Sequence, residues 1–364
     1  MRRLPPWAIE LLAVLISVAA ALGVTYLAIL KVSQQPGEAF NQLLLGPLGS
    51  SRTIGIWIDD AAKLTLAGLS LSLVFQARQF SLGIQGQVYL GGLAAGLVAL
   101  SGLGTSPLAI PLGLLSAMLV GAAYGYIPGL LKARLGANEI VSSLMLNYIA
   151  IDVFTWLIHS YISDSRLGLT NSPPFPAAAV YPALVANTRI DLGLIFALIG
   201  TVATWFLLYR TRIGFDLRLV GHNPRFAAHA GIDVKRVIAG SMAIAGLLGG
   251  ALGAVLVQGQ AFGELSVGFE ATISLEGLLV AIVARNRPLL VPVVALAYSY
   301  LRQGAVLMGL NSDVPAEAIS IVKGLIILLV ASGGLFAWLR PRATAAPLAP
   351  VIPGDGRLED PGSV

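Results

Sequence analysis

The chain has no cysteine among its 364 residues, and only 11% of them are charged. Without cysteine it can form neither disulfides nor thiolate metal sites. So small a charged fraction, with 56% hydrophobic residues and a mean hydropathy of +0.83, excludes an ordinary soluble globular protein. The composition therefore indicates a chain whose surroundings are lipid.

Recognisable catalytic motifs are also missing. The sequence contains no Walker glycine loop, no His-Glu-x-x-His helix and no serine nucleophile elbow. No set of His, Asp or Cys gathers at a shared membrane depth, so a membrane-embedded enzyme or scaffold is the least favoured class. We expect no catalytic residue, metal or cofactor in this chain, and the energy for any transport must then come from elsewhere.

What the sequence does contain is long apolar runs. A helix of roughly 20 apolar residues crosses about 30 Å of hydrocarbon, and such runs recur along the chain. They predict an all-α polytopic membrane protein with about ten transmembrane helices. Close helix approach is expected from the 41 glycines. The predicted spans cover residues 7–30, 61–76, 80–100, 108–131, 138–160, 190–209, 236–258, 272–284, 288–308 and 318–339.

Two of these spans, 61–76 and 272–284, are too short to cross a bilayer alone. They predict broken or tilted helices that end inside the protein. The first span, 7–30, is too long for the apolar part of a cleaved signal peptide, and a signal anchor is preferred.

Basic residues predict the orientation, because short cytoplasmic loops hold an excess of Lys and Arg. Arg2 and Arg3 place the N-terminus in the cytoplasm, and ten spans return the C-terminus there. The formal net charge of +5 is thereby explained as a topology signal rather than as a nucleic-acid site. The other basic residues on the predicted cytoplasmic side are Arg78, Lys132, Arg134, Arg210, Arg212, Arg218, Arg225, Lys235, Arg236, Arg285, Arg287, Arg340 and Arg342.

Residues 1–343 are predicted to form one transmembrane domain, followed by a disordered cytoplasmic tail at 344–364. The longest cytoplasmic loop is 210–236. Within it, Asn223-Pro224 is suited to cap and start a short helix that Gly231 would end. The segment is either an ordinary basic loop that sets topology or a docking surface for a partner protein. Its candidate docking residues are Gly221, His222, Asn223, Pro224, Arg225, Ala227, Ala228 and Gly231.

Polar residues follow the predicted fifth span in two adjacent stripes at spacings of three and four. In hydrocarbon they need partners, so we expect them to face another helix or a wet pathway. They either only join helices, at about 1 kcal/mol each, or line the path of a solute. For the first two residues, capping at the cytoplasmic start of the helix is a third interpretation. The stripes are Asn138, Ser142, Met145, Ile149 and Asp152, and Glu139, Ser143 and Asn147.

A second polar group, formed by Gln85, Gln87 and Tyr89, follows a predicted helix break at Gly83 and Gly86. Unwound backbone there would offer donors and acceptors to a hydroxyl-rich solute near the membrane midplane. A tight turn on the cytoplasmic side is the alternative, which the nearby Arg78 favours.

Asp152 and His159 are the deepest ionisable residues of the predicted spans. Each is expensive in lipid unless it is paired, and together they would suit a proton relay. They motivate a proton-coupled secondary transporter as a second class of function.

Several segments, in order over about residues 60–335, resemble the permeases of bacterial nucleoside and simple-sugar ABC importers, a family similar to branched-chain amino acid and ribose permeases. The most specific is 138–149, which is most similar to nucleoside permeases. The resemblance implies an α-helical permease in the cytoplasmic membrane, paired with a second permease and with cytoplasmic ATPases that hydrolyse ATP, and supplied by an extracytoplasmic solute-binding protein. The segments are 66–69, 83–87, 136–149, 221–232, 301–305, 314–315 and 323–328.

The chain departs from the family pattern at two places. Gln85 stands where the family usually has a carboxylate, and 270–277 replaces a simpler aspartate-glycine step. These departures leave the substrate less defined than the transport class. A nucleoside is expected first, with a simple sugar such as ribose as the alternative. Planar contacts to a base would come from aromatic residues such as Phe80, Tyr89 and Trp156.

Overall fold

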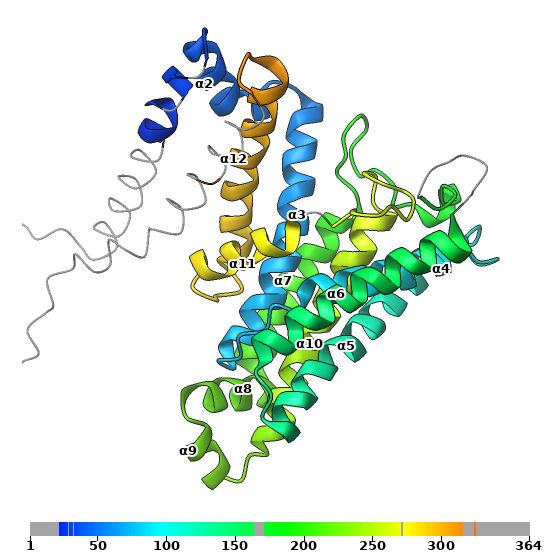
Figure 1. The fold of residues 1–364 in the computed structure, drawn as a ribbon, viewed down its shortest axis with the longest axis vertical. Helices are drawn as coiled ribbons and strands as arrows, with labels where there is room; N and C mark the ends of the chain where they lie inside the picture. The colour runs from blue at the N-terminus through cyan, green and yellow to red at the C-terminus, as the bar shows by residue number, and fades with distance from the viewer. Residues whose placement is uncertain are drawn as a thin grey trace, which may run out of the picture.

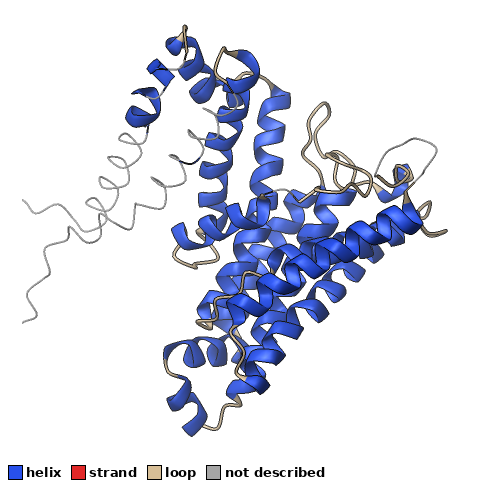
Figure 2. Cartoon of the chain, in the orientation of Figure 1, coloured by secondary structure: helices blue, strands red, loops and turns tan. Residues whose placement is uncertain are grey.

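The computed structural model describes residues 22–27, 29–31, 33–163, 171–270, 272–315 and 324. Helices dominate this part of the chain (Figure 2), and its β-pairing is an isolated bridge between Asn171 and Ser266. The all-α prediction is confirmed. Five helices of 19 to 27 residues are long and apolar enough to cross a membrane. They are α5 (Ala109–Leu135), α6 (Glu139–Leu157, continued to Ile162 by the π-helical turn η2, Ile158–Ile162), α7 (Leu192–Arg210), α10 (Val234–Gln258) and α12 (Val291–Asn311).

Further elements complete the described fold. The described residues between 22 and 31 are helical. The predicted span 318–339, except residue 324, the tail 344–364 and the start of span 7–30 lie outside the described residues. The remaining elements are α2 (Pro36–Leu45), η1 (Gly46–Leu48), α3 (Ser51–Gln76), α4 (Ile84–Leu100), η3 (Ala177–Ala179), α8 (Arg212–His222), α9 (Pro224–His229) and α11 (Ile273–Val283).

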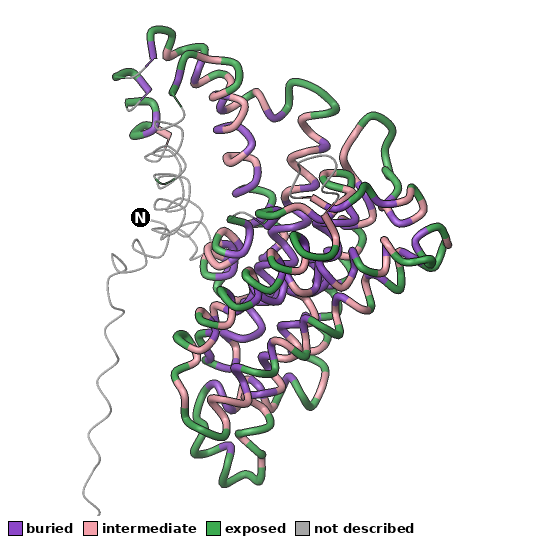
Figure 3. The backbone as a smooth tube through the Cα atoms, turned by 45° about the vertical axis from the view of Figure 1, so that its right-hand side comes forward, coloured by how far each residue is buried: buried purple, intermediate pink, exposed green. Residues whose placement is uncertain are grey.

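Helix α10 lies at the centre, packed along α5, α4 and α3 (Figure 1). Glycines set its distance from α5. A Cβ added at Gly121 would lie 2.3 Å from the carbonyl oxygen of Gly246, and one at Gly250 would lie 2.0 Å from that of Ala117. Small residues let backbones approach closely where lipid offers no hydrophobic driving force. The expected glycine-mediated packing is present, and buried residues concentrate in this central region (Figure 3).

Helix α3 corrects one prediction. The span expected at 61–76 is not short, because α3 runs for 26 residues from Ser51, and the Ser50 hydroxyl caps it by accepting from the Thr53 N–H at 3.1 Å. A buried pair of opposite charges lies within its first half. Asp59 and Lys63 pair at 2.6 Å, with side chains only 5% and 4% exposed. These charges therefore neutralise one another within the helix instead of ending it.

Helix α11 confirms the other short span, with 11 residues at Ile273–Val283. It packs against α3 and α12.

Beyond the end of α12, the Ser33 hydroxyl and the Gln34 N–H donate to Asp313 at 2.5 and 2.6 Å. These hydrogen bonds lower the pKa of that exposed carboxyl.

Candidate functional site

Two interruptions of the helical chain meet inside the protein. Helix α4 begins after the non-helical residues 77–83, and α11 begins after the non-helical residues 259–270. The Gln85 side-chain amide donates to Glu270 Oε2 at 3.0 Å. The other carboxylate oxygen of Glu270 accepts the Ser274 N–H at 2.7 Å, and Glu270 is 0% exposed. The first turns of two helices thus converge on one buried carboxylate, and helix N-termini favour negative charge.

Three aromatic rings adjoin this junction. Tyr89 lies one turn after Gln85, and its ring centroid is 5.1 Å from that of Phe154 and 5.0 Å from that of Phe269. The last two rings are 5.4 Å apart, and all three residues are buried. Phe269 directly precedes Glu270, so an amide, a carboxylate and an aromatic cluster lie together.

Helix α6 holds the break before α4. The Asn147 side-chain amide donates to the Leu82 carbonyl at 2.8 Å and accepts from the Gly86 N–H at 2.9 Å. The Leu82 N–H donates to the Ser143 hydroxyl at 3.0 Å. These contacts satisfy backbone groups that the unwound segment would leave unpaired. Both predicted residues therefore join α6 to the start of α4.

Gln87 lies deeper, between α5 and α10. A Cβ at Gly125 would lie 2.9 Å from its Nε2, and one at Gly249 would lie 2.5 Å from its Oε1. Among the described residues, Oε1 of this buried amide has no hydrogen-bond partner, nor does the buried hydroxyl of Ser274. Burying a polar atom without a hydrogen-bond partner costs free energy.

The other stripe of α6 points away from the interior. Asn138 caps the helix, its Oδ1 accepting from the N–H groups of Ile140 at 2.9 Å and Val141 at 3.4 Å. Glu139, which begins the stripe of Ser143 and Asn147, pairs with Lys132 at 2.5 Å. Because Ser143 and Asn147 are buried while the first stripe is more exposed, the two stripes do not form one inward face. The residues of the first stripe with intermediate or high exposure are Asn138, Ser142, Met145, Ile149 and Asp152, and His159 is exposed as well.

Of the three aromatic residues considered for a base contact, only Tyr89 lies in the interior. Phe80 is 51% exposed and stacks on Phe75 with centroids 4.8 Å apart. Trp156 is 57% exposed and contacts Tyr161 edge-on.

The expected short helix in the 210–236 loop is present as α9 (Figure 1, bottom). The Asn223 side chain accepts the Phe226 N–H at 3.1 Å, Pro224 is the first helical residue, and Gly231 has φ +84°, a value that favours glycine. The side chain of Phe226 is 59% exposed. Helix α9 therefore presents an open surface at the end of the molecule.

Helix α8, which we did not predict, connects this surface to the bundle. A Cβ at Gly221 would lie 2.2 Å from the Gln76 carbonyl oxygen, so glycine lets α8 rest on the end of α3. The Gln76 side chain donates to the Asn286 carbonyl at 2.8 Å, in the loop after α11. A chain of direct contacts thus runs from α8 through α3 to the short helix α11.

A second polar network also escaped prediction. Arg302 of α12 contacts Glu276 of α11 at 3.1 Å and Asp60 of α3 at 3.9 Å, and the Thr272 hydroxyl donates to Glu276 at 3.0 Å. Charges inside apolar spans are a recognisable signal, because lipid tolerates them only when they are paired or functional. Glu270 lies between the predicted spans 236–258 and 272–284, so this signal does not mark it.

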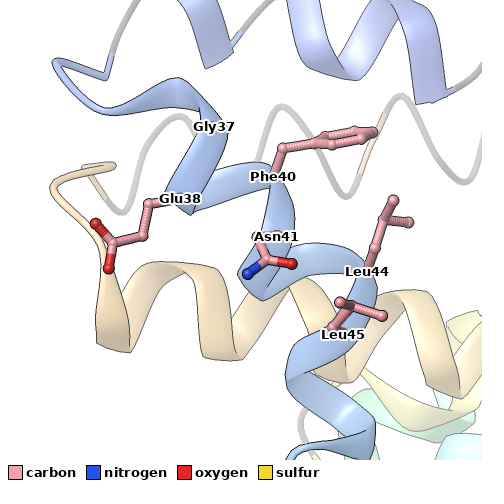
Figure 4. A pocket seen from close by; sticks show the side chains of 6 residues that line it. All are labelled: Gly37, Glu38, Phe40, Asn41, Leu44 and Leu45. Atoms are coloured by element: carbon pink, nitrogen blue, oxygen red, sulfur yellow. The ribbon is translucent and has the colours of Figure 1, made fainter.

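Two open hollows lie elsewhere, outside the predicted site residues. One, of about 650 Å³, is lined by Pro107, Ile110, Ala177, Ala178, Val180, Tyr181, Pro182 and Gln260. The other, of about 630 Å³, is on α2 (Figure 4) and is lined by Gly37, Glu38, Phe40, Asn41, Leu44 and Leu45. Within the described residues, no group of three or more His, Asp or Glu could hold a metal ion.

Residues 54–331 match the family described as the permease component of the branched-chain amino acid transport system. The chain belongs to this family. It is a multi-pass cell-membrane permease, as its apolar helices indicate. It is 30% identical to the guanosine ABC transporter permease protein NupP of Bacillus subtilis, over 91% of this chain and 95% of the relative.

Two further relatives share most of their length with this permease. It is 32% identical to the nucleoside ABC transporter permease protein NupB of Lactococcus lactis, over 85% of this chain and 87% of the relative. It is 28% identical to the glucose ABC transporter permease protein TsgB13 of Haloferax volcanii, over 92% and 90%. No solved structure matches the chain.

Proposed function

We propose that the chain is the permease subunit of an ATP-driven importer that carries a nucleoside into the cytoplasm. The observation that carries the substrate class is the buried hydrogen bond between Gln85 and Glu270 beside the rings of Tyr89, Phe154 and Phe269. A nucleoside combines hydroxyl and N–H donors, which suit a carboxylate, with a planar base, which suits aromatic rings. The guanosine and nucleoside permeases among the relatives support this choice.

A simple sugar is the second candidate, favoured by the likeness to a glucose permease. Its hydroxyl groups would donate hydrogen bonds to the same carboxylate, Glu270. The aromatic cluster favours the nucleoside, because a base has a larger planar surface to bury.

The proposed topology has ten spans with both termini in the cytoplasm. Its support is that the described basic loops follow the ends of α3, α5, α7 and α11, whereas the alternate loops are poor in Lys and Arg. In this topology α8 and α9 lie on the cytoplasmic side.

We place the ATPase docking surface on α9, with Arg225, Phe226 and His229 exposed. Movement of a docked ATPase would pass through Gly221 to Gln76 and on to α11. The solute-binding protein would dock on the opposite, extracytoplasmic side.

A second permease subunit would cover the outer face of α6. Asp152 is exposed within a 24-residue apolar span. An acidic residue at the centre of a membrane helix costs about 2.5–3.5 kcal/mol, so a protein partner is a better neighbour than lipid. Because the chain lacks cysteine, Tyr148→Cys gives a single reactive thiol on this face. Labelled with a thiol-reactive photocrosslinker, it should crosslink to the second permease on irradiation, whereas Val202→Cys on the exposed face of α7, labelled in the same way, should not.

The subunit composition tests the whole proposal. The tagged chain is extracted from native membranes in mild detergent, and the proteins that accompany it are identified by mass spectrometry. We expect ATPase and second permease subunits. A chain that comes alone and still transports after reconstitution would instead be a gradient-driven carrier, for which Asp152 and His159 would be the relay.

A further inference from the structure

We propose that Glu270 is the specificity-determining residue of this permease, accepting a hydrogen bond from a ribose hydroxyl of the solute, and that Gln85 positions it. This inference rests on the proposed function and assigns its recognition chemistry to one carboxylate.

The hydrogen bonding of Glu270 leaves room for a ligand. An ionised carboxylate has about four acceptor positions, and the described residues fill two of them, through Gln85 and the Ser274 N–H. The two hydrogen bonds come from neutral donors, and none of the ion pairs among the described residues includes Glu270. By contrast, the buried Asp59 has Lys63 at 2.6 Å. A buried carboxylate without a cation is retained where it has a function.

A second observation points to a ligand at the same place. The hydroxyl of Ser274, whose N–H already reaches Glu270, is buried to 4% exposure, lies beside the same carboxylate and makes no hydrogen bond of good geometry with the described residues. A solute hydroxyl would supply the missing partner.

The chemistry of the junction selects the solute. A carboxylate only accepts hydrogen bonds, so it favours hydroxyl donors and repels a phosphate. The ring system of the solute would then lie beside the aromatic cluster of Tyr89, Phe154 and Phe269. The class is therefore a neutral, hydroxyl-bearing ring compound, and a nucleoside rather than a nucleotide.

The test compares solutes that differ by one hydroxyl. Cells lacking the chain but retaining its partners are complemented with wild type or Glu270→Gln, and the uptake of guanosine, 2′-deoxyguanosine and 3′-deoxyguanosine is measured. Loss of a charged hydrogen bond should lower Vmax/KM for guanosine about ten- to a hundredfold. The deoxy analogue that lacks the recognised hydroxyl should be poorly carried by wild type and no further impaired by the substitution.

The matched control is Glu264→Gln. Glu264 also accepts a side-chain amide, from Asn171 at 2.8 Å, and lies in the same loop before α11. Cells carrying Glu264→Gln should take up guanosine as fast as cells carrying wild type. A second variant, Gln85→Glu with Glu270→Gln, keeps one carboxylate and one amide in contact but moves the charge to α4. It should accumulate normally in membranes and still lose the preference for guanosine over the deoxy analogue.

Three results would overturn the inference: unchanged guanosine uptake in Glu270→Gln, equal loss for guanosine and both deoxy analogues, or full preference in the exchanged pair. If wild type carries glucose and not guanosine, the proposed function fails. The same comparison with glucose and its monodeoxy analogues then decides the role of Glu270 separately.

Discussion

Removing the Asn147 side chain should destabilise the junction between α6 and α4 selectively. Asn147→Ala deletes the hydrogen bonds to the Leu82 carbonyl at 2.8 Å and the Gly86 N–H at 2.9 Å. Each buried group left unpaired costs about 1–3 kcal/mol. Side-chain hydrogen bonds within membranes average about 0.6 kcal/mol and reach about 1.7. Because Leu82 lies in non-helical backbone and the Gly86 N–H lies in the first turn of α4, neither group has a helical partner, and we expect a loss of about 2–4 kcal/mol in the free energy of unfolding.

The assay is equilibrium unfolding of the detergent-solubilised protein, with Ser142→Ala as the control. Ser142 lies on the neighbouring stripe of α6, and its hydroxyl donates only to the Glu139 carbonyl at 3.4 Å. The control should change the free energy of unfolding by less than about 0.5 kcal/mol. If Asn147→Ala is equally mild, the contacts with Leu82 and Gly86 do not hold the break, and our account of α4 is wrong.

Three other substitutions test the packing. Gly121→Leu should abolish a monodisperse peak in size-exclusion chromatography, because a Cβ there meets a carbonyl at 2.3 Å, whereas Gly240→Leu, with open space around it, should not. Lys63→Met should cost about 3–5 kcal/mol of unfolding free energy, because it leaves Asp59 buried and unpaired. Adding Asp59→Asn should recover most of this loss. If the double variant is as destabilised as Lys63→Met alone, the pairing is contradicted. Gly221→Val should push α8 off the end of α3 and leave ATP hydrolysis uncoupled from uptake, so tight coupling in this variant would refute the proposed route.

Local sequence signals predicted the features that depend on local chemistry. The Asn138 and Asn223 caps follow from side chains that reach an N–H within three residues. The short span at α11 follows from the length of its apolar run. The predicted cytoplasmic helix needed only Asn223-Pro224 at its start and Gly231 after its end.

Features that depend on tertiary contacts were not accessible in this way. Periodicity shows that Ser143 and Asn147 share a stripe, but not that α4 rather than lipid lies against it. Hydropathy began the α3 span too late, at residue 61, because it counts Asp59 as solvated although Lys63 neutralises it. The contact between Gln85 and Glu270 joins residues 185 positions apart, and no local pattern encodes such a pairing.

ATP-dependent guanosine uptake tests the central claim most directly. A strain that lacks this chain is complemented with wild type, and the entry of labelled guanosine is followed with and without ATP depletion, and with and without a protonophore at preserved ATP. The account predicts uptake that requires the chain, stops when ATP is depleted and continues with the protonophore. Uptake that continues without ATP and stops with the protonophore would contradict it.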